Sequence, residues 1–187
     1  MSIIQSLKSR VGRFASDQSG TVTVEAVMTV PILFLVVGVT YEFFEVHRYK
    51  SARDKATYTV GDMISREMAP IDDGYIDNTK ALFDEIANDN GATQLRVSVI
   101  KFDEDSDRYS VAWSEIRGSG SLETLATADV AEDHASLPDM SDGEEMILVE
   151  WESNYRPLFK VGFGDGFDVE SGMFISPRFA PQIIWED

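Results

Sequence analysis

The segment Gly20–Phe44, GTVTVEAVMTVPILFLVVGVTYEFF, decides how the rest of this 187-residue chain is arranged. Between Ala26 and Tyr41 it contains no charged side chain. At about 1.5 Å of rise per residue, a helix over residues 21–44 is roughly 36 Å long, which is enough to cross a hydrocarbon core of about 30 Å. The segment therefore predicts a transmembrane helix.

One carboxylate, Glu25, interrupts the apolar segment near its start. A charged side chain costs about 2.5–3.5 kcal/mol at the centre of a membrane helix and less toward its ends, so Glu25 is a candidate functional residue. A simpler interpretation places it one turn inside the interface, with its side chain reaching the lipid head groups. Pro31 follows six residues later, and because it removes a backbone donor and crowds a carbonyl, it predicts a kink in this helix.

The residues around Glu25 resemble a class III prepilin signal peptide, and in particular that of the TadE-like minor pilins of tight-adherence pilus systems. The matching features are the basic leader with Lys8, Arg10 and Arg13, the pair Ser19-Gly20, the pair Val24-Glu25, and Pro31 followed by Ile-Leu-Phe-Leu. The resemblance covers roughly residues 13–60. It implies that a prepilin peptidase cuts between Gly20 and Thr21, so that Glu25 becomes the fifth residue of the processed chain. Ala26 stands where an aromatic residue follows the glutamate in major pilins, which favours a minor pilin or pseudopilin.

The spacing from Thr21 to Glu25 also has a physical rationale. Cleavage after Gly20 exposes an amino group at Thr21, and Glu25 lies four residues along the same helical face. In a packed filament, the amino group of one subunit can neutralise the carboxylate of another, and a buried charge is tolerable only when it is paired. The resemblance further implies the partners: other pilins or pseudopilins, the prepilin peptidase and an inner-membrane assembly platform, in a structure used for cell adhesion.

The charge distribution orients the helix and excludes one class of partner. The formal net charge is -17, and residues 21–187 hold 13 basic and 32 acidic side chains. Such a chain repels phosphate, so we exclude nucleic-acid binding. Because lysine and arginine favour the cytoplasmic side, the leader is expected in the cytoplasm and residues 45–187 in the periplasm, on a single-pass inner-membrane protein. The resemblance implies that this protein enters a pilus after processing. With no cysteine, the chain has no disulfide framework.

These observations predict four parts: a basic leader (1–20), the transmembrane helix (21–44), an amphipathic helical extension (45–69) and an acidic α+β head (70–187). Apolar residues continue at helical spacing after Phe44, so one helix over residues 21–67 is expected; two helices joined near Glu45 are the alternative. Residues 1–15 are compatible with a short amphipathic helix. The head is expected to contain an antiparallel sheet of about four strands with helices on one face.

Within the head, the patterns predict the individual elements. A loop over residues 70–75 precedes a helix that is capped by Asp77 or Asn78, runs through Asn88 and buries Leu82. Asn90-Gly91 follows it as the signal that ends the helix. The expected elements after it are strands near 95–101 and 109–113 joined by a hairpin, a helix over 122–133, a strand over 145–155, a loop over 157–168 and an edge strand opened by residues 173–179.

The sequence offers no set of residues for catalysis. His47 and His134 each lack a second histidine or a cysteine at metal-ligand spacing, and no nucleophile motif is present. We therefore expect no enzyme, no cofactor and no metal centre. The acidic turn Asp103–Asp107 lacks the spacing of a calcium loop, so a solvated hairpin tip is favoured over a calcium site. Phe159, Phe163 and Phe167 form a candidate contact with a partner subunit.

Two other functions remain open at this point. The chain is alternatively a bitopic inner-membrane protein that keeps residues 1–20 and binds or senses a ligand through its periplasmic head. A secreted enzyme is the third hypothesis, and the missing catalytic set argues against it. The N-terminal residue of the membrane-bound protein separates the three.

Overall fold

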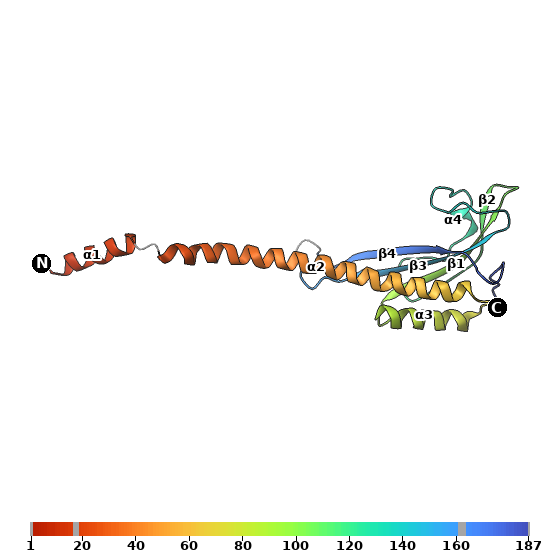
Figure 1. The fold of residues 1–187 in the computed structure, drawn as a ribbon, viewed down its shortest axis with the longest axis horizontal. Coiled ribbons are helices and arrows are strands. Elements are labelled where there is room, and N and C mark those ends of the chain that lie inside the picture. The colour runs from red at the N-terminus through yellow and green to blue at the C-terminus, as the bar shows by residue number, and fades with distance from the viewer. Residues whose placement is uncertain (1, 17–18, 161–163, 187) are drawn as a thin grey trace. The chain divides into compact units, whose positions relative to one another are not determined.

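The computed structural model of the chain describes residues 2–16, 19–160 and 164–186, with the backbone alone for residues 2–7, 9 and 19. The chain divides into two compact units, Met1–Phe43 and Phe44–Asp187. In the first unit, α1 (Ser2–Ser16) confirms the predicted short helix in the leader. The long helix α2 (Ser19–Ser65) begins in this unit and continues into the second (Figure 1).

The bounds of α2 confirm one continuous helix and exclude the alternative of two helices joined near Glu45. The helix runs through Pro31 and Gly61 without a break in its assignment. It ends two residues before the predicted residue 67, where Met68-Ala69-Pro70 follows and proline disfavours helical geometry in the residue before it.

The second unit contains a four-stranded antiparallel sheet, as predicted, in the order β2-β1-β3-β4. Its strands are β1 (Thr93–Asp103), β2 (Arg108–Arg117), β3 (Glu145–Tyr155) and β4 (Phe167–Ile175). β1 and β2 form the predicted hairpin, and β3 has the predicted bounds. The last strand begins earlier than expected: Phe167 and Asp168 belong to β4 and not to a loop, and Pro177 follows the strand, although β4 is an edge strand as predicted.

The main core lies between the sheet and two helices, the later turns of α2 and α3 (Asp73–Ala87), which lie side by side (Figure 1). The buried residues of this core are Ala56, Val60 and Ile64 from α2, Ile76, Phe83 and Ala87 from α3, Leu95, Val97, Val99, Ile147, Val149 and Trp151 from the sheet, and Ile71 and Ile183 from the segments before α3 and after β4. Trp151 is fully buried and is its largest side chain. The period of the apolar residues in α2 therefore reflects packing on the sheet.

A second, smaller core covers the opposite face of the sheet. Ile100, Phe102 and Tyr109 pack there against Val130 and Leu137. A register shift between Val99 and Ile100 opposite β2 allows this arrangement, because Val111 then faces the small core and Trp113 the main core. The expectation of helices on one face only is thus incomplete, since the segment that holds α4 (Thr127–Val130) covers the other face.

The helix expected over residues 122–133 is wrong: only the four residues of α4 are helical. The backbone of Leu122 donates to and accepts from the side chain of Gln94, and the N–H of Leu125 donates to Ser114. These bonds from β1 and β2 replace the intrahelical bonds of the expected helix.

The predicted start of α3 is also wrong. Asp72 caps the helix by accepting from the N–H of Tyr75 at 2.7 Å, so Asp73-Gly74-Tyr75 is helical and not part of a loop. Its end agrees with the prediction, since Asn88 caps the helix in the left-handed conformation. Leu82, expected to be buried, is 36% exposed.

The segment after β4 closes the end of the unit near the start of α3. Ile71 and Trp185 form a parallel bridge, in which the N–H of Ile71 donates to the carbonyl of Ile184 and the N–H of Glu186 donates to that of Ile71. The indole of Trp113 donates to the carbonyl of Ile183 at 2.7 Å and lies 5.4 Å from the ring of Trp185. We refer to residues 183–186 as the tail clasp.

Candidate functional site

The first candidate site is the apolar part of α2 in the first unit. Its side chains are exposed around the whole helix: Val22, Val24, Val27, Met28, Ile32, Leu33, Phe34 and Leu35 are each more than half exposed. The helix is long and apolar enough to span a membrane, and none of its most apolar window is buried. A helix that exposes apolar residues on every side is expected in lipid or in contact with other helices. The chain thus has a candidate membrane anchor.

The residues of the predicted processing site lie together at the start of this helix. Gly20, Thr21 and Glu25 are all helical and exposed. Thr21 and Glu25 lie one turn apart on the same face, as the spacing predicts. Among the residues that the structure describes, none forms an ion pair or a hydrogen bond with the Glu25 side chain. Cleavage after Gly20 and the kink at Pro31 stay predictions.

The phenylalanines of the predicted aromatic contact lie in different parts of the structure. Phe159 is 45% exposed in the connection between β3 and β4. Phe167 is the first residue of β4, and its ring lies 5.6 Å from that of Tyr155. Phe163 lies outside the described residues. The contact with a partner subunit stays a prediction.

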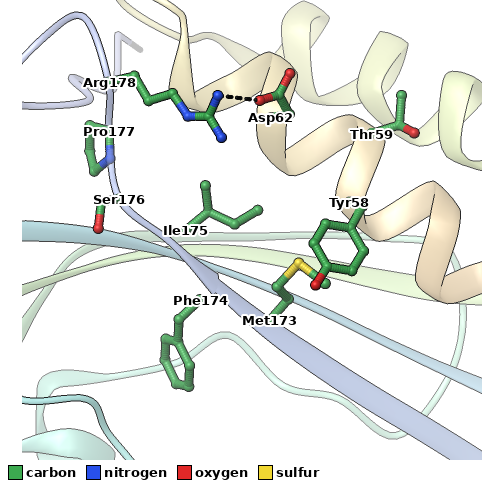
Figure 2. A pocket seen from close by; sticks show the side chains of 9 residues that line it. All are labelled: Tyr58, Thr59, Asp62, Met173, Phe174, Ile175, Ser176, Pro177 and Arg178. Carbon is green, nitrogen blue, oxygen red and sulfur yellow. Dashed lines mark ion pairs between the residues drawn. The ribbon is translucent and has the colours of Figure 1, made fainter.

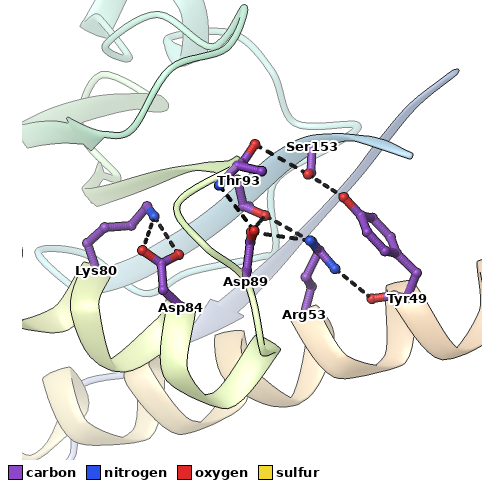
Figure 3. Close-up of polar contacts among 8 residues, drawn as sticks. Tyr49, Arg53, Lys80, Asp84, Asp89, Thr93 and Ser153 are labelled. Atoms are coloured by element: carbon purple, nitrogen blue, oxygen red, sulfur yellow. Dashed lines mark hydrogen bonds and ion pairs between the residues drawn. The ribbon is translucent and has the colours of Figure 1, made fainter. Parts of the chain in front are cut away.

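A buried ion pair at the start of the second unit is a feature that the sequence did not reveal. Arg53 of α2 is 4% exposed, and its guanidinium lies 3.2 Å from the carboxylate of Asp89 (Figure 3). Its Nε donates to Thr93 at 2.9 Å, and one Nη donates to the carbonyl of Tyr49 at 3.3 Å. The guanidinium also stacks 3.3 Å from the centre of the Tyr49 ring.

These contacts join three elements of the head. Asp89 lies between α3 and β1, Thr93 begins β1, and the hydroxyl of Tyr49 lies 2.5 Å from that of Ser153 in β3 (Figure 3). Arg53 belongs to the apolar stripe of α2, since it lies three residues before Ala56. An arginine in such a stripe is a signal of a buried pair that the sequence contains.

A groove of 710 Å³ lies between α2 and the end of β4 (Figure 2). Tyr58 and Asp62 line it from α2, and Met173 and Ile175 from β4. Arg178 lies 3.1 Å from Asp62 and forms an ion pair there. Within the described ranges, no group of three potential metal ligands is present anywhere in the chain.

The acidic turn between β1 and β2 is held by its own side chains. Asp103 accepts hydrogen bonds from the backbone N–H and the hydroxyl of Ser106, both at 2.8 Å. These bonds favour the ionised form and lower the pKa of Asp103. The carboxylate therefore organises the turn, and its two bonds agree with a solvated hairpin tip.

Comparison of the chain with protein-family models, with curated proteins and with solved structures finds no match in any of the three.

Proposed function

We propose that the chain is a membrane-anchored assembly subunit: a minor pilin or pseudopilin of a tight-adherence (type IVc-like) pilus or secretion system. The observation that supports this proposal is the difference in exposure between the two halves of α2. Its apolar first half exposes hydrophobic side chains on all sides, whereas its second half is buried in the core of an α+β head. A helix of this kind joins a folded head to an apolar segment that is free to pack with other helices.

Glu25 is the residue through which the anchor selects its neighbours in this proposal. It is the only charged side chain between Asp17 and Glu42, and it has no ion-pair partner among the described residues. In an apolar environment a carboxylate requires a counter-charge, which the amino group of a processed neighbouring chain supplies. The head remains periplasmic and performs no chemical step; the subunit acts by insertion, cleavage after Gly20 and lateral packing.

Intact-mass spectrometry of the native membrane protein tests the cleavage. The expected mass begins at Thr21, and Gly20→Leu is expected to leave the leader attached. A Cβ atom at Gly20 meets nothing within 4 Å, and the same holds at Gly12, so Gly12→Leu is the matched control that leaves cleavage intact. Recovery of wild-type protein that begins at Met1 or Ser2 contradicts the proposal and supports the uncleaved anchor.

A second variant tests the role of Glu25. Glu25→Ala is expected to be cleaved and membrane-inserted but to be lost from filaments sheared off the cells. Thr29→Ala, one turn farther along the same face, is the control and is expected to assemble normally. Equal amounts of both variants in the sheared fraction contradict the role assigned to Glu25.

A further inference from the structure

The second unit contains a cation that lacks a counter-charge. Acidic side chains outnumber basic ones in residues 21–187, so most basic side chains find a partner. Nine of the 13 form ion pairs. Within the described ranges, Lys50, Lys55, Lys101 and Arg156 form none. Of these four, Arg156 lines two neighbouring cavities. An unpaired arginine in so acidic a chain is available to an external anion.

The larger of these two cavities, of 580 Å³, is equipped to hold an anion. Its charged lining residues are Arg156, Arg53 and Asp89, and the charge of Asp89 is offset by its ion pair with Arg53. The net charge of the lining is therefore positive, in contrast to the chain as a whole. Asn88 and Asn90 add side-chain amides, which donate hydrogen bonds.

Arg53 gives this cavity a buried charge whose position is fixed by its neighbours, unlike a charge on a mobile surface side chain. It is 4% exposed and is held by Asp89, Thr93 and the carbonyl of Tyr49. These three contacts use three of the five N–H groups of its guanidinium. The two remaining N–H groups of Arg53 and the guanidinium of Arg156 are donors of the kind that phosphate oxygens accept, often in a bidentate manner.

The position of the cavity along the chain indicates the source of the anion. Tyr49, which lines it, follows Phe44 by five residues, or about 7.5 Å of helix. The head-group layer on each side of a bilayer is about 5–7 Å thick, and tyrosine is enriched there. We infer that the cavity between Tyr49, Asn90 and Arg156 binds the phosphate of an anionic lipid head group. This inference rests on the membrane anchoring in the proposed function, not on cleavage after Gly20.

Thermal unfolding of the full chain in mixed micelles tests the inference. Phosphatidylglycerol is added in increasing fraction to a neutral detergent, with phosphatidylcholine as the uncharged comparison. Phosphatidylglycerol is expected to raise the unfolding temperature of the wild type. Arg156→Gln is expected to require a roughly three- to tenfold higher lipid fraction for half of that rise, because one charge-assisted contact is lost. Arg156→Lys is expected to restore part of the response.

Lys101→Gln is the matched control, since Lys101 is equally unpaired but lines neither cavity, and it is expected to respond like the wild type. Equal responses of Arg156→Gln and wild type overturn the inference. Inorganic phosphate is tested in the same way. If it raises the unfolding temperature of the wild type as much as phosphatidylglycerol does, the assignment to a lipid is overturned. Intact mass, measured on the same preparations, reports cleavage separately, so a failure of the lipid site is distinguishable from a failure of the proposed function.

Discussion

Arg53 shows how a single side chain holds the long helix on the head. Its charge is buried, paired with Asp89 and shared among three elements. Removing one partner of a buried pair leaves the other charge uncompensated, which costs about 3–5 kcal/mol. We therefore predict that Arg53→Met lowers the free energy of unfolding of the full chain in detergent by about this amount, measured by denaturant titration followed by tryptophan fluorescence.

The control for Arg53 is an exposed pair on the same helix. Arg48 lies 2.6 Å from Glu45, and its side chain is 77% exposed. Exposed pairs contribute about 0–1 kcal/mol, so Arg48→Met is expected to change little. The double variant Arg53→Met with Asp89→Asn removes both charges and is expected to recover part of the loss. Equal losses for Arg53→Met and Arg48→Met contradict the role of the buried pair.

Tyr75 gives the head a weakness at alkaline pH. Its hydroxyl is buried and has no hydrogen-bond partner among the described residues. Burial and the nearby charge of Glu67 raise the pKa of Tyr75 from 10.0 to about 12. As the pH rises, the unfolded chain loses this proton before the folded chain does. The contribution of Tyr75 to the free energy of unfolding is therefore fully present below pH 10 and is lost as the pH rises to about 12.

Tyr75→Phe isolates this effect. The variant is expected to be no less stable at neutral pH, because the hydroxyl forms no bond there, and to lose less stability than the wild type between pH 10 and 12. The measurement is the unfolding temperature of both proteins across that range. Other tyrosines and lysines titrate equally in both, so parallel curves contradict the assignment.

The contact of α2 with β4 depends on the absence of a side chain at Gly61. A Cβ atom there would lie 2.0 Å from the terminal carbon of Ile175. The flexible end of Ile175 has room to adjust to one methyl group, whereas a larger side chain displaces the strand. We predict that Gly61→Leu lowers the free energy of unfolding by about 1–3 kcal/mol, as overpacking does, in the same denaturant assay.

Lys55→Leu, on the exposed side of the same helix, is the control for Gly61→Leu and is expected to lie within about 0.5 kcal/mol of the wild type. Ile175→Ala combined with Gly61→Leu is expected to be less damaging than the two single effects added together, since it removes the clashing atoms. Additive losses contradict a direct contact. The close approach of Ile175 is thus the packing reason for a glycine at position 61.

The elements that were predictable are those whose pattern is local. The apolar periods of α2 and β3 are long and uninterrupted, and both were found close to their expected bounds. The segment 122–133 was not predictable, because Gln94 and Ser114 supply its backbone partners from distant positions. The start of α3 is an intermediate case: Asp72 is a good capping residue, but Gly74 in the first turn concealed the helix.

The candidate anchor was readable from the sequence, whereas the charged features of the head were not. Glu25 is conspicuous because its neighbours are uniformly apolar. Arg53 and Arg156 are two of the 13 basic residues in residues 21–187. Only the fold places Arg53 beside Asp89 and brings Arg156 to the same cavity. Local patterns identify an exception to a rule; they do not identify partners that the tertiary structure brings together.

The net charge of -17 makes the whole chain sensitive to ionic strength. Self-repulsion destabilises a compact state, and salt screens it. We predict that sodium chloride raises the unfolding temperature of the full chain in neutral detergent. Asp105→Lys, in the exposed turn between β1 and β2, reverses one charge and is expected to weaken this dependence. An unfolding temperature that falls with salt contradicts the prediction.

The tail clasp imposes an order of events on biogenesis. Residues 183–186 bond to Ile71 and to Trp113, so the junction between α2 and α3 is completed by the segment that is synthesised more than a hundred residues later. Until residues 183–186 have been synthesised, this junction lacks its final partner. The chain around Ile71 is therefore open to proteolysis for most of the time that synthesis takes, and it is protected only when the last residues have been added.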